Sequence, residues 1–382
     1  MLKVRFFGDF CVDQLRDLRF GNHLKALLSE SDINVVNLEA PILASANAKA
    51  IEKSGPSLFQ DVTVPEFLER NGFNVILLAN NHAMDFGESA LLATKSAFSK
   101  AKCVGAGKQD EAYAPLIMEC GGKKLGILAV CQNEFGMLDE DSYLHKRYGV
   151  AWLGHPLVDE AILKARKECD WLVVVPHAGL ESFEHPLPEL RTLYRHFITM
   201  GADAVVGGHP HVPQGVECYR GKPIFYSLGN FCFDMISDAP QWYNGMMAEL
   251  SFDENGVFFS FMPLSFDIAR RMVEIDASVS ANENIRYLSD ILCHEKEYLD
   301  LVNSHCLSLA GHYDMLNEMS GYYRLPTLRS CLGRCKRILV NMLKGKQETP
   351  LQSHYINNLR CETHRWVLSR IYEVSHQNPV KK

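Results

Sequence analysis

The segment Ala204–Gln214, AVVGGHPHVPQ, constrains the fold and chemistry of this chain more than any other stretch. An apolar run typical of a buried strand stops at Gly207-Gly208, and two histidines, His209 and His211, follow with one proline between them. A glycine break after a strand places the next residues at the carboxyl edge of a sheet, where open α/β sheets bind their ligands. The proline restricts the backbone, so the two imidazoles lose little further entropy when they are held toward one point. Because imidazole binds Zn, Mn, Fe and Co well, the segment indicates a metal site.

Other apolar runs of the chain also end in polar side chains of metal-binding types. The residues concerned are Asp9, Glu39, Asn81-His82 with Asp85, and His177, in addition to the histidine pair at 209 and 211. A carboxylate or imidazole at the end of a buried strand is costly unless a partner compensates for its desolvation. One such residue is usually a satisfied hydrogen-bonding group, whereas five strand ends of the same chemistry are better explained by one shared metal centre. Two carboxylates, an amide oxygen and three imidazoles suit two divalent ions, for which Mn, Fe and Zn are the candidates.

Strand-like and helical patterns alternate through most of the chain, which indicates an α/β sandwich. At 382 residues the chain is long enough for one large domain with an appendage. From about residue 280 onward the pattern is helical, with few strand signals. We therefore predict one domain over residues 1–270 and a helical, partly basic extension over residues 271–382.

The composition argues against several classes of protein. A formal net charge of −7 speaks against wholesale nucleic-acid binding, so no nucleic-acid partner is expected. The first residues enter a strand pattern without a secretory signal, and no apolar run reaches the roughly 18–20 residues needed to span a bilayer. We therefore expect a cytoplasmic protein whose twelve cysteines are mostly reduced thiols.

The segment 324–346 is unusual in charge, because it carries seven basic residues and no acidic one. Apolar residues lie among the basic ones, a pattern typical of a basic amphipathic helix. One interpretation is that it binds an anionic membrane surface, at the inner face of the membrane, or the machinery of polymer synthesis. The preferred interpretation is a helix packed on the main domain with a solvated basic face.

The candidate residues also carry a resemblance to a known family. Six stretches resemble, in order and at matching spacing, the CapA-type capsule and poly-γ-glutamate biosynthesis family, which is similar to the calcineurin-like metallophosphoesterases. These stretches are Gly8-Asp9, Asn37–Pro41, Ala79–Gly87, Gly105–Gly107, Gly201–Gly215 and Ile224–Phe231. The resemblance covers about residues 3–265 and does not reach the C-terminal part.

The resemblance implies a four-layer α/β/β/α sandwich of the metallophosphoesterase type, with a dinuclear metal site between its two sheets. The implied ligands are Asp9 and His211 for one ion, Asn81, His177 and His209 for the other, and Glu39 as a bridge between both. His82 would donate a proton to a leaving group, and Asp85 would orient it. The implied reaction is hydrolysis by water that two divalent ions activate.

Two departures from the family pattern concern the walls of this site. Cys11 stands where the phosphoesterase superfamily commonly has the histidine of Asp-x-His. CapA-type chains also lack this histidine, which predicts weaker binding of one ion. Ala178 stands where CapA-type chains often have tryptophan. Glu181 is a candidate substrate-binding residue or a solvated loop acid, and Asn230 is a candidate substrate-binding residue or a turn-stabilising one.

Three functions are compatible with these features. The main prediction is a CapA-type metal-dependent hydrolase that acts on an anionic, acyl or phosphoryl compound of capsule, poly-γ-glutamate or other surface-polymer metabolism. The second is an accessory subunit that binds a polymer or partner proteins without turnover, and the third is a general phosphatase or phosphodiesterase of small metabolites. Nothing in the ligand set chooses between attack at phosphorus and attack at an amide or ester carbon.

Overall fold

The computed structural model describes residues 1–43, 48–138, 148–311, 313 and 357–377. The chain divides into two compact units, one made of Met1–Ile51 with Ser57–Tyr298 and the other of Glu52–Pro56 with Leu299–Lys382. The basic segment 324–346 lies outside the described residues, so its role in binding a membrane or a partner stays a prediction. Within the described part, every helix is too short or too polar to cross a bilayer.

The first unit contains a nine-stranded sheet in the order β2-β18-β17-β16-β1-β3-β4-β5, with β15 also paired to β1. Its strands are β1 (Leu2–Cys11), β2 (Arg19–Phe20), β3 (Ile33–Leu38), β4 (Val75–Leu77), β5 (Lys102–Val104), β15 (Asn230–Phe233), β16 (Asn244–Asp253), β17 (Gly256–Asp267) and β18 (Met272–Ile275). Strand β1 is buried along nearly its whole length, as expected for a central strand covered on both faces. It pairs in parallel with β3 and β15 and antiparallel with β16.

A six-stranded sheet has the order β13-β14-β12-β11-β8-β7. Its strands are β7 (Leu116–Cys120), β8 (Lys123–Cys131), β11 (Trp171–His177), β12 (Ala204–Val206), β13 (Val216–Tyr219) and β14 (Lys222–Phe225). A small third sheet joins β6 (Ala106–Gly107), β9 (Met137–Leu138) and β10 (Gly149–Ala151). The two large sheets therefore each supply a set of parallel strands.

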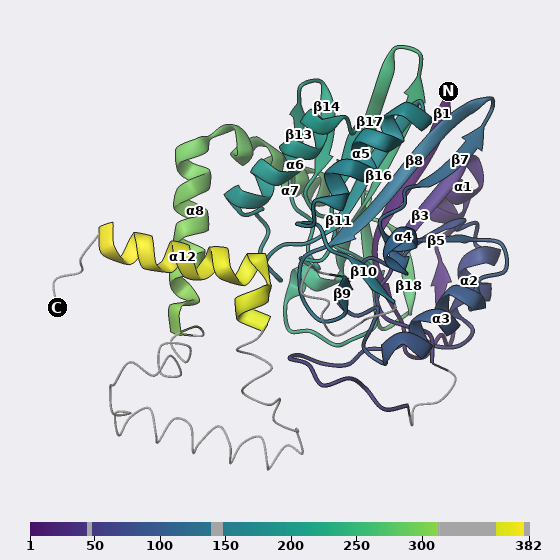
Figure 1. Ribbon diagram of the computed structural model, residues 1–382, viewed down its shortest axis with the longest axis horizontal. Coiled ribbons are helices and arrows are strands. Elements are labelled where there is room, and N and C mark those ends of the chain that lie inside the picture. Colours follow the sequence, from purple (N-terminus) through teal and green to yellow (C-terminus); the bar gives the residue numbers. More distant parts are fainter. Residues whose placement is uncertain (44–47, 139–147, 312, 314–356, 378–382) are drawn as a thin grey trace. The chain divides into compact units, whose positions relative to one another are not determined.

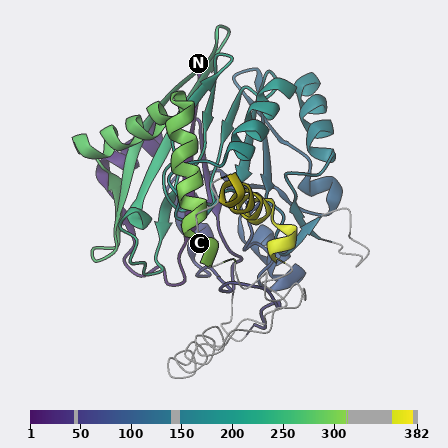
Figure 2. The same cartoon turned by 90° about the vertical axis from the view of Figure 1, so that its left-hand side faces the viewer.

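Helices connect these parallel strands and cover the outer faces of the sheets (Figure 1). The helices are α1 (Asn22–Glu30), α2 (Val64–Arg70), α3 (Gly87–Ala97), α4 (Gln109–Ala112), α5 (Leu157–Glu168), α6 (Pro188–Met200) and α7 (Val279–Asp290), with short 3-10 turns at Pro240–Tyr243 and Ile291–Cys293. Crossovers between parallel strands are right-handed, so the helices that follow successive strands in one direction lie on one face. By this rule α1, α2 and α3 cover the nine-stranded sheet, and α5 and α6 cover the six-stranded sheet (Figure 2). The predicted four-layer α/β/β/α sandwich is confirmed.

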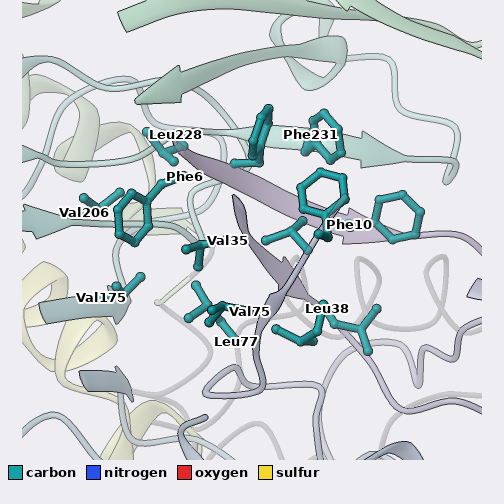
Figure 3. Packing of buried hydrophobic residues seen from close by; sticks show 14 of the residues in the cluster. Phe6, Phe10, Val35, Leu38, Val75, Leu77, Val175, Val206, Leu228 and Phe231 are labelled. Atoms are coloured by element: carbon teal, nitrogen blue, oxygen red, sulfur yellow. The ribbon is translucent and has the colours of Figure 1, made fainter. Parts of the chain in front are cut away.

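The faces of the two large sheets that carry no helices contribute to one continuous core. Figure 3 shows Phe6 and Val35 of the nine-stranded sheet near Val175 and Val206 of the six-stranded sheet, and all four belong to one buried cluster. Burial of each such side chain contributes roughly 1.5–3 kcal/mol relative to exposure. The core lies directly beneath the edge at which the parallel strands end, so it fixes the spacing of the side chains at that edge.

The first unit extends past residue 270, the boundary predicted from the sequence, to Tyr298. Strand β18 pairs with β17, and Tyr298 at the end of the unit donates from its hydroxyl to the carbonyl of Pro186 at 2.7 Å. Between them, the buried guanidinium of Arg191 donates to the carbonyl of Leu292 at 3.0 Å. These contacts tie the segment after residue 270 to α6, while the boundary of an independently folding domain stays a prediction.

The second unit is helical where it is described. Helix α12 (Glu362–Gln377) lies within it, and helix α8 (Glu295–Ser308) enters it at Leu299. The hydroxyl of Tyr313 lies 2.7 Å from Nδ1 of His364, and Arg370 donates to Asn303 at 3.1 Å. The helical character predicted for the C-terminal region is therefore present in its described part.

Gly8 allows two backbone segments to approach closely beside the candidate centre. A Cβ atom at this position would overlap the carbonyl oxygen of Gly229, which itself accepts a hydrogen bond from the Asp9 amide at 3.0 Å. The lack of a side chain at residue 8 therefore lets β1 and the start of β15 hold Asp9 beside Asn230.

The substitution Gly8→Ala should force these two backbones apart. We expect a loss of at least about 2 kcal/mol in the free energy of unfolding, because an overpacked backbone cannot relax as a flexible side chain does. Thermal and urea unfolding of the metal-free protein would measure it. Gly311→Ala is the matched control, since no atom lies within 4 Å of a Cβ added at that exposed position. Equal stability of the two variants would contradict the packing described.

Candidate metal centre

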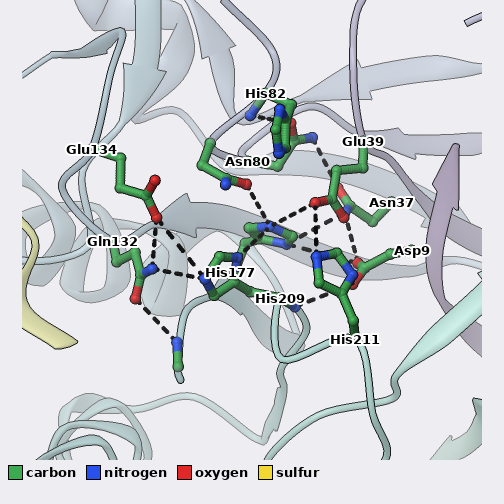
Figure 4. Close-up of polar contacts among 12 residues, drawn as sticks. Asp9, Asn37, Glu39, Asn80, His82, Gln132, Glu134, His177, His209 and His211 are labelled. Carbon is green, nitrogen blue, oxygen red and sulfur yellow. Dashed lines mark hydrogen bonds and ion pairs between the residues drawn. The ribbon is translucent and has the colours of Figure 1, made fainter. Parts of the chain in front are cut away.

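The carboxyl ends of parallel strands from both sheets converge on one buried cluster (Figure 4). The predicted residues that meet there are Asp9 from β1, Glu39 after β3, Asn81 after β4, His177 at the end of β11, and His209 and His211 after β12. Each of these side chains is buried, and Asp9 and Glu39 are fully so. The structure therefore brings together all six predicted ligand positions, and their roles as ligands stay a prediction.

One part of the cluster contains Asp9, Glu39 and His211, each with a ligand atom within 4.8 Å of the others. Nε2 of His211 lies 3.5 Å from Oε1 of Glu39, and Nδ1 lies 3.5 Å from Oδ2 of Asp9. The Asp9 carboxylate also accepts from the backbone amide of His209 at 3.3 Å. Two carboxylates and one imidazole at this spacing are a usual ligand set for a divalent cation.

The other part contains Glu39, His177 and His209, again within 4.8 Å of one another. Nε2 of His177 lies 3.2 Å from Nδ1 of His209 and 3.1 Å from Oδ1 of Asn81. Glu39 belongs to both groups, as the resemblance implied for a bridging carboxylate.

This donor set fits cations better than it fits hydrogen bonds alone. Besides Asn81 and His209, Nε2 of His177 faces Oε1 of Glu39 at 3.8 Å, and one imidazole nitrogen cannot satisfy several such neighbours at once. Oε1 of Glu39 is itself buried and has no hydrogen-bond partner among the described residues. A buried carboxylate oxygen without a partner is costly. Cations between these atoms would accept lone pairs from all of them.

Burial sets the protonation of the metal-free cluster. It raises the pKa of Glu39 well above the ordinary value of 4.5, and the neighbouring Asp9 carboxylate raises it further. Burial also raises the pKa of Asp9, although His211 and the Asn37 amide oppose the shift. The pKa of His177 lies well below its ordinary value of 6.5 because of burial and the nearby His209. Without ions, the Asp9 and Glu39 carboxyls therefore resist ionisation and the His177 imidazole resists protonation. Bound cations would favour the ionised form of the two carboxyls.

The predicted proton donor and its orienting acid also meet. Nδ1 of His82 lies 2.7 Å from Oδ2 of Asp85, an oxygen that also accepts from the Leu58 amide at 2.7 Å. A neutral imidazole that donates from Nδ1 carries its lone pair on Nε2. Asp85 therefore selects one ring orientation and one tautomer of His82.

The amide side chains that hold the carboxylates were not predicted from the sequence. Asn37 donates to Oδ1 of Asp9 at 2.8 Å and lies 3.3 Å from Nδ1 of His177. Asn80 in turn donates to Oδ1 of Asn37 at 3.1 Å and to the Leu38 carbonyl at 2.9 Å. The available signal was a buried asparagine inside the apolar strand β3, where an amide needs a partner.

Two further residues missed from the sequence lie behind His209. The side-chain nitrogen of Gln132 is 2.8 Å from Nε2 of His209 and donates to Glu134 at 2.7 Å. Its oxygen accepts from the Gly179 amide at 3.0 Å. The available signal was the end of the apolar strand β8 at Cys131, with Glu134 shortly after it.

The remaining predicted positions have different surroundings. Glu181 is exposed, and its charge contributes to the raised pKa of Glu39, so it lies near enough to act electrostatically on the cluster. Cys11 packs in an apolar cluster with Ala40, Phe233 and Trp242, and burial raises the pKa of its thiol well above the ordinary value. Neither candidate ligand group among the described residues includes this cysteine. Asn230 is buried and hydrogen-bonded within the protein.

The backbone at the two histidines is strained. His209 has φ of 96° and His211 has φ of 61°, in the left-handed region that residues other than glycine rarely adopt. Such residues cost on the order of 1–3 kcal/mol each and persist where the surroundings over-determine them. The strain supports a functional reason for these two positions.

The substitution Glu39→Gln should reveal the cost of the buried charge in chelator-treated protein. A raised carboxyl pKa in the folded state means that stability is full below the ordinary pKa and falls as pH rises through the folded-state pKa. The variant should therefore melt above the unsubstituted protein by a margin that grows from about pH 5 to about pH 8. Differential scanning calorimetry measures this, with the exposed Glu254→Gln as control. A margin that shrinks with pH would contradict the electrostatics described.

Comparison with known families assigns residues 17–235 to the model described as bacterial capsule synthesis protein PGA_cap. The chain is 31% identical over 216 residues to the PGA biosynthesis protein CapA of Bacillus subtilis (strain 168), a match that covers 56% of each chain. It is 30% identical over 221 residues to the capsule biosynthesis protein CapA of Bacillus anthracis, which covers 56% of this chain and 53% of that one. The chain thus spans somewhat more than half the length of these curated relatives.

Among solved structures, the chain is similar to a hypothetical protein from Thermus thermophilus, with a TM-score of 0.45 and 18% identity over 69% of this chain and 99% of that one. It is also similar to a 5'-nucleotidase from Candida albicans SC5314, with a TM-score of 0.40 and 9% identity over 70% and 53%. Likeness at this level carries no argument about activity. The family match spans more than half of the chain and includes Glu39, Asn81 and the three imidazoles of the cluster, and the chain belongs to the bacterial capsule synthesis protein family PGA_cap.

Proposed function

We propose that this protein is a metal-dependent hydrolase that cleaves an ester or amide bond in a compound of surface-polymer metabolism. The observation that carries the proposal is the pair of buried ligand groups that share Glu39. Support for the polymer connection comes from the family and from relatives named for capsule and PGA biosynthesis.

Two divalent cations are part of the proposal. Asp9, Glu39 and His211 would hold one, and Asn81, His177 and His209 would hold the other together with Glu39. When bound, such ions supply Lewis-acid polarisation of a substrate oxygen and activation of water. Mn, Fe and Zn all suit a set of carboxylate, amide and imidazole ligands.

The chain's own residues supply the remaining parts of a hydrolytic site. The Asp85 carboxylate accepts from Nδ1 of His82 and would stabilise the imidazolium formed when Nε2 takes up a proton, and that proton would then be available to a leaving group. The buried amides of Asn37 and Gln132 hold the acids and His209 in place before substrate arrives. Glu181 lies exposed beside the cluster and is proposed to contact substrate.

A second candidate function is favoured by one specific observation. The chain is 27% identical over 233 residues to a probable polyglutamine synthesis accessory protein of Mycobacterium tuberculosis (strain ATCC 25618 / H37Rv), and the word accessory describes assistance rather than turnover. In this alternative the ions would have a structural or binding role. The two candidates differ in whether the metal-loaded protein consumes substrate.

The metal content of purified protein tests the first step. We expect about two equivalents of Mn, Fe or Zn after growth with added metal, and the loss of at least one after either His211→Ala or His177→Ala. Inductively coupled plasma mass spectrometry measures it. His196→Ala is the matched control, because His196 pairs with Asp159 at 3.0 Å on the surface, away from the cluster. Protein that binds no ion after added Mn²⁺ would overturn the proposal.

Turnover by the metal-loaded protein tests the second step. We expect cleavage of p-nitrophenyl phosphate esters or of γ-glutamyl p-nitroanilide, and which is cleaved distinguishes attack at phosphorus from attack at carbon. His82→Ala should lower kcat by about 10²–10⁴-fold without changing the metal content, because a positioned acid is lost while the ligands remain. Full metal loading with no turnover of either class would favour the accessory function.

A further inference from the structure

Both polar groups of the Asn230 side chain are committed within the protein. Its oxygen lies 3.0 Å from Nδ1 of His211, and its nitrogen donates to the backbone carbonyl of Trp242 at 2.9 Å. The side chain is 3% exposed. A substrate therefore has little of this amide left to contact, and the candidate substrate role from the sequence gives way to a different one.

The Trp242 carbonyl determines the orientation of the Asn230 amide. A carbonyl oxygen only accepts, so the NH₂ group of Asn230 must face it, and the amide oxygen must then face His211. The Trp242 ring packs on the His211 ring, with centroids 4.7 Å apart, and on Phe233 at 5.2 Å. This packing holds the carbonyl, and with it the amide, in position.

The amide orientation decides the tautomer of His211. An amide oxygen can only accept, so the hydrogen-bonded tautomer carries its proton on Nδ1. The Asp9 carboxylate oxygen, 3.5 Å from the same nitrogen, favours the same tautomer. The lone pair of the ring then resides on Nε2, which faces Oε1 of Glu39 at 3.5 Å.

We propose that Asn230 is a positioning residue that keeps His211 in the Nδ1–H tautomer with Nε2 ready to bind a divalent cation together with Asp9 and Glu39. This role rests on the proposed metal site. It means that a residue that is not itself a ligand contributes to the affinity for the ion. Metal-bound histidines usually donate their other ring N–H to an oxygen that fixes the ring and its tautomer. Asn230 provides that oxygen from β15, the strand that Gly8 allows to lie against β1.

Three variants separate positioning from mere structural support. Asn230→Leu removes the oxygen at nearly constant volume. Asn230→Asp keeps an oxygen toward His211 in either protonation state, and its acid form can still donate to the Trp242 carbonyl. Asn34→Leu is the matched control, since the buried Asn34 amide makes its hydrogen bonds at the opposite end of β3. It donates to the Leu28 and Gly72 carbonyls at 2.8 and 3.0 Å and accepts from the Ser31 hydroxyl at 2.5 Å.

The first readout is the histidine tautomer in metal-free protein, measured by long-range ¹H–¹⁵N NMR with ¹⁵N-labelled histidine and assigned with His211→Ala. We expect a protonated Nδ1 for His211 in the unsubstituted protein, in Asn230→Asp and in Asn34→Leu, and a loss of that preference in Asn230→Leu. The second readout is Mn²⁺ affinity by titration calorimetry. Asn230→Leu should weaken binding about 10–100-fold, whereas Asn230→Asp should restore it to within about tenfold of the original.

Unchanged tautomer and affinity in Asn230→Leu would overturn the inference, as would equal weakening in Asn34→Leu or a failure of Asn230→Asp to restore binding. Unsubstituted protein that binds no Mn²⁺ would overturn the proposed function instead. The NMR readout on metal-free protein would still decide the tautomer in that case, so the two failures are distinguishable.

Discussion

Desolvation of two carboxylates among three imidazoles is the constraint on which the rest of this structure depends. Asp9 and Glu39 are fully buried, and Glu39 keeps one oxygen without a hydrogen-bond partner in the described structure. Removing carboxylates from water costs several kcal/mol each unless opposite charge or good hydrogen bonds compensate. The imidazole of His177 resists protonation, so this side chain supplies little positive charge to offset them. Divalent cations are the compensation that the ligand types and their spacing fit.

The fold makes this concentration of polar groups possible. The parallel strands of both sheets end at the same side of the sandwich. Residues far apart in sequence can therefore meet there without long loops. Close backbone contact at Gly8 and left-handed backbone at His209 and His211 add local cost. The large shared core offsets such costs, and amides such as Asn37 and Asn230 hold the ligands in place. Local strain and buried charge thus occur together at the proposed metal ligands.

The pattern of apolar runs predicted an α/β sandwich with polar residues gathered at one sheet edge, and the family resemblance implied its four layers. The ends of the apolar strands β1, β3, β11 and β12 can be recognised in the sequence. Polar residues that directly follow such a strand must lie at the edge of a sheet. The supporting residues could not be predicted in this way. Asn37 lies inside a strand, and Gln132 lies behind His209 and not among the ligands. The role of Asn230 depends on the carbonyl of Trp242, whose position only tertiary packing determines. The extension of the first unit to Tyr298 similarly depends on contacts of Arg191 and Tyr298 that no local pattern encodes.

This cluster is proposed to hold cations between its carboxylates and imidazoles. The most direct measurement is X-ray diffraction from crystals grown with Mn²⁺, with data collected on both sides of the manganese absorption edge. The account predicts two anomalous peaks, one bounded by Asp9, Glu39 and His211 and one by Glu39, Asn81, His177 and His209. Crystals that show the same side-chain arrangement with no anomalous density at either place would contradict it.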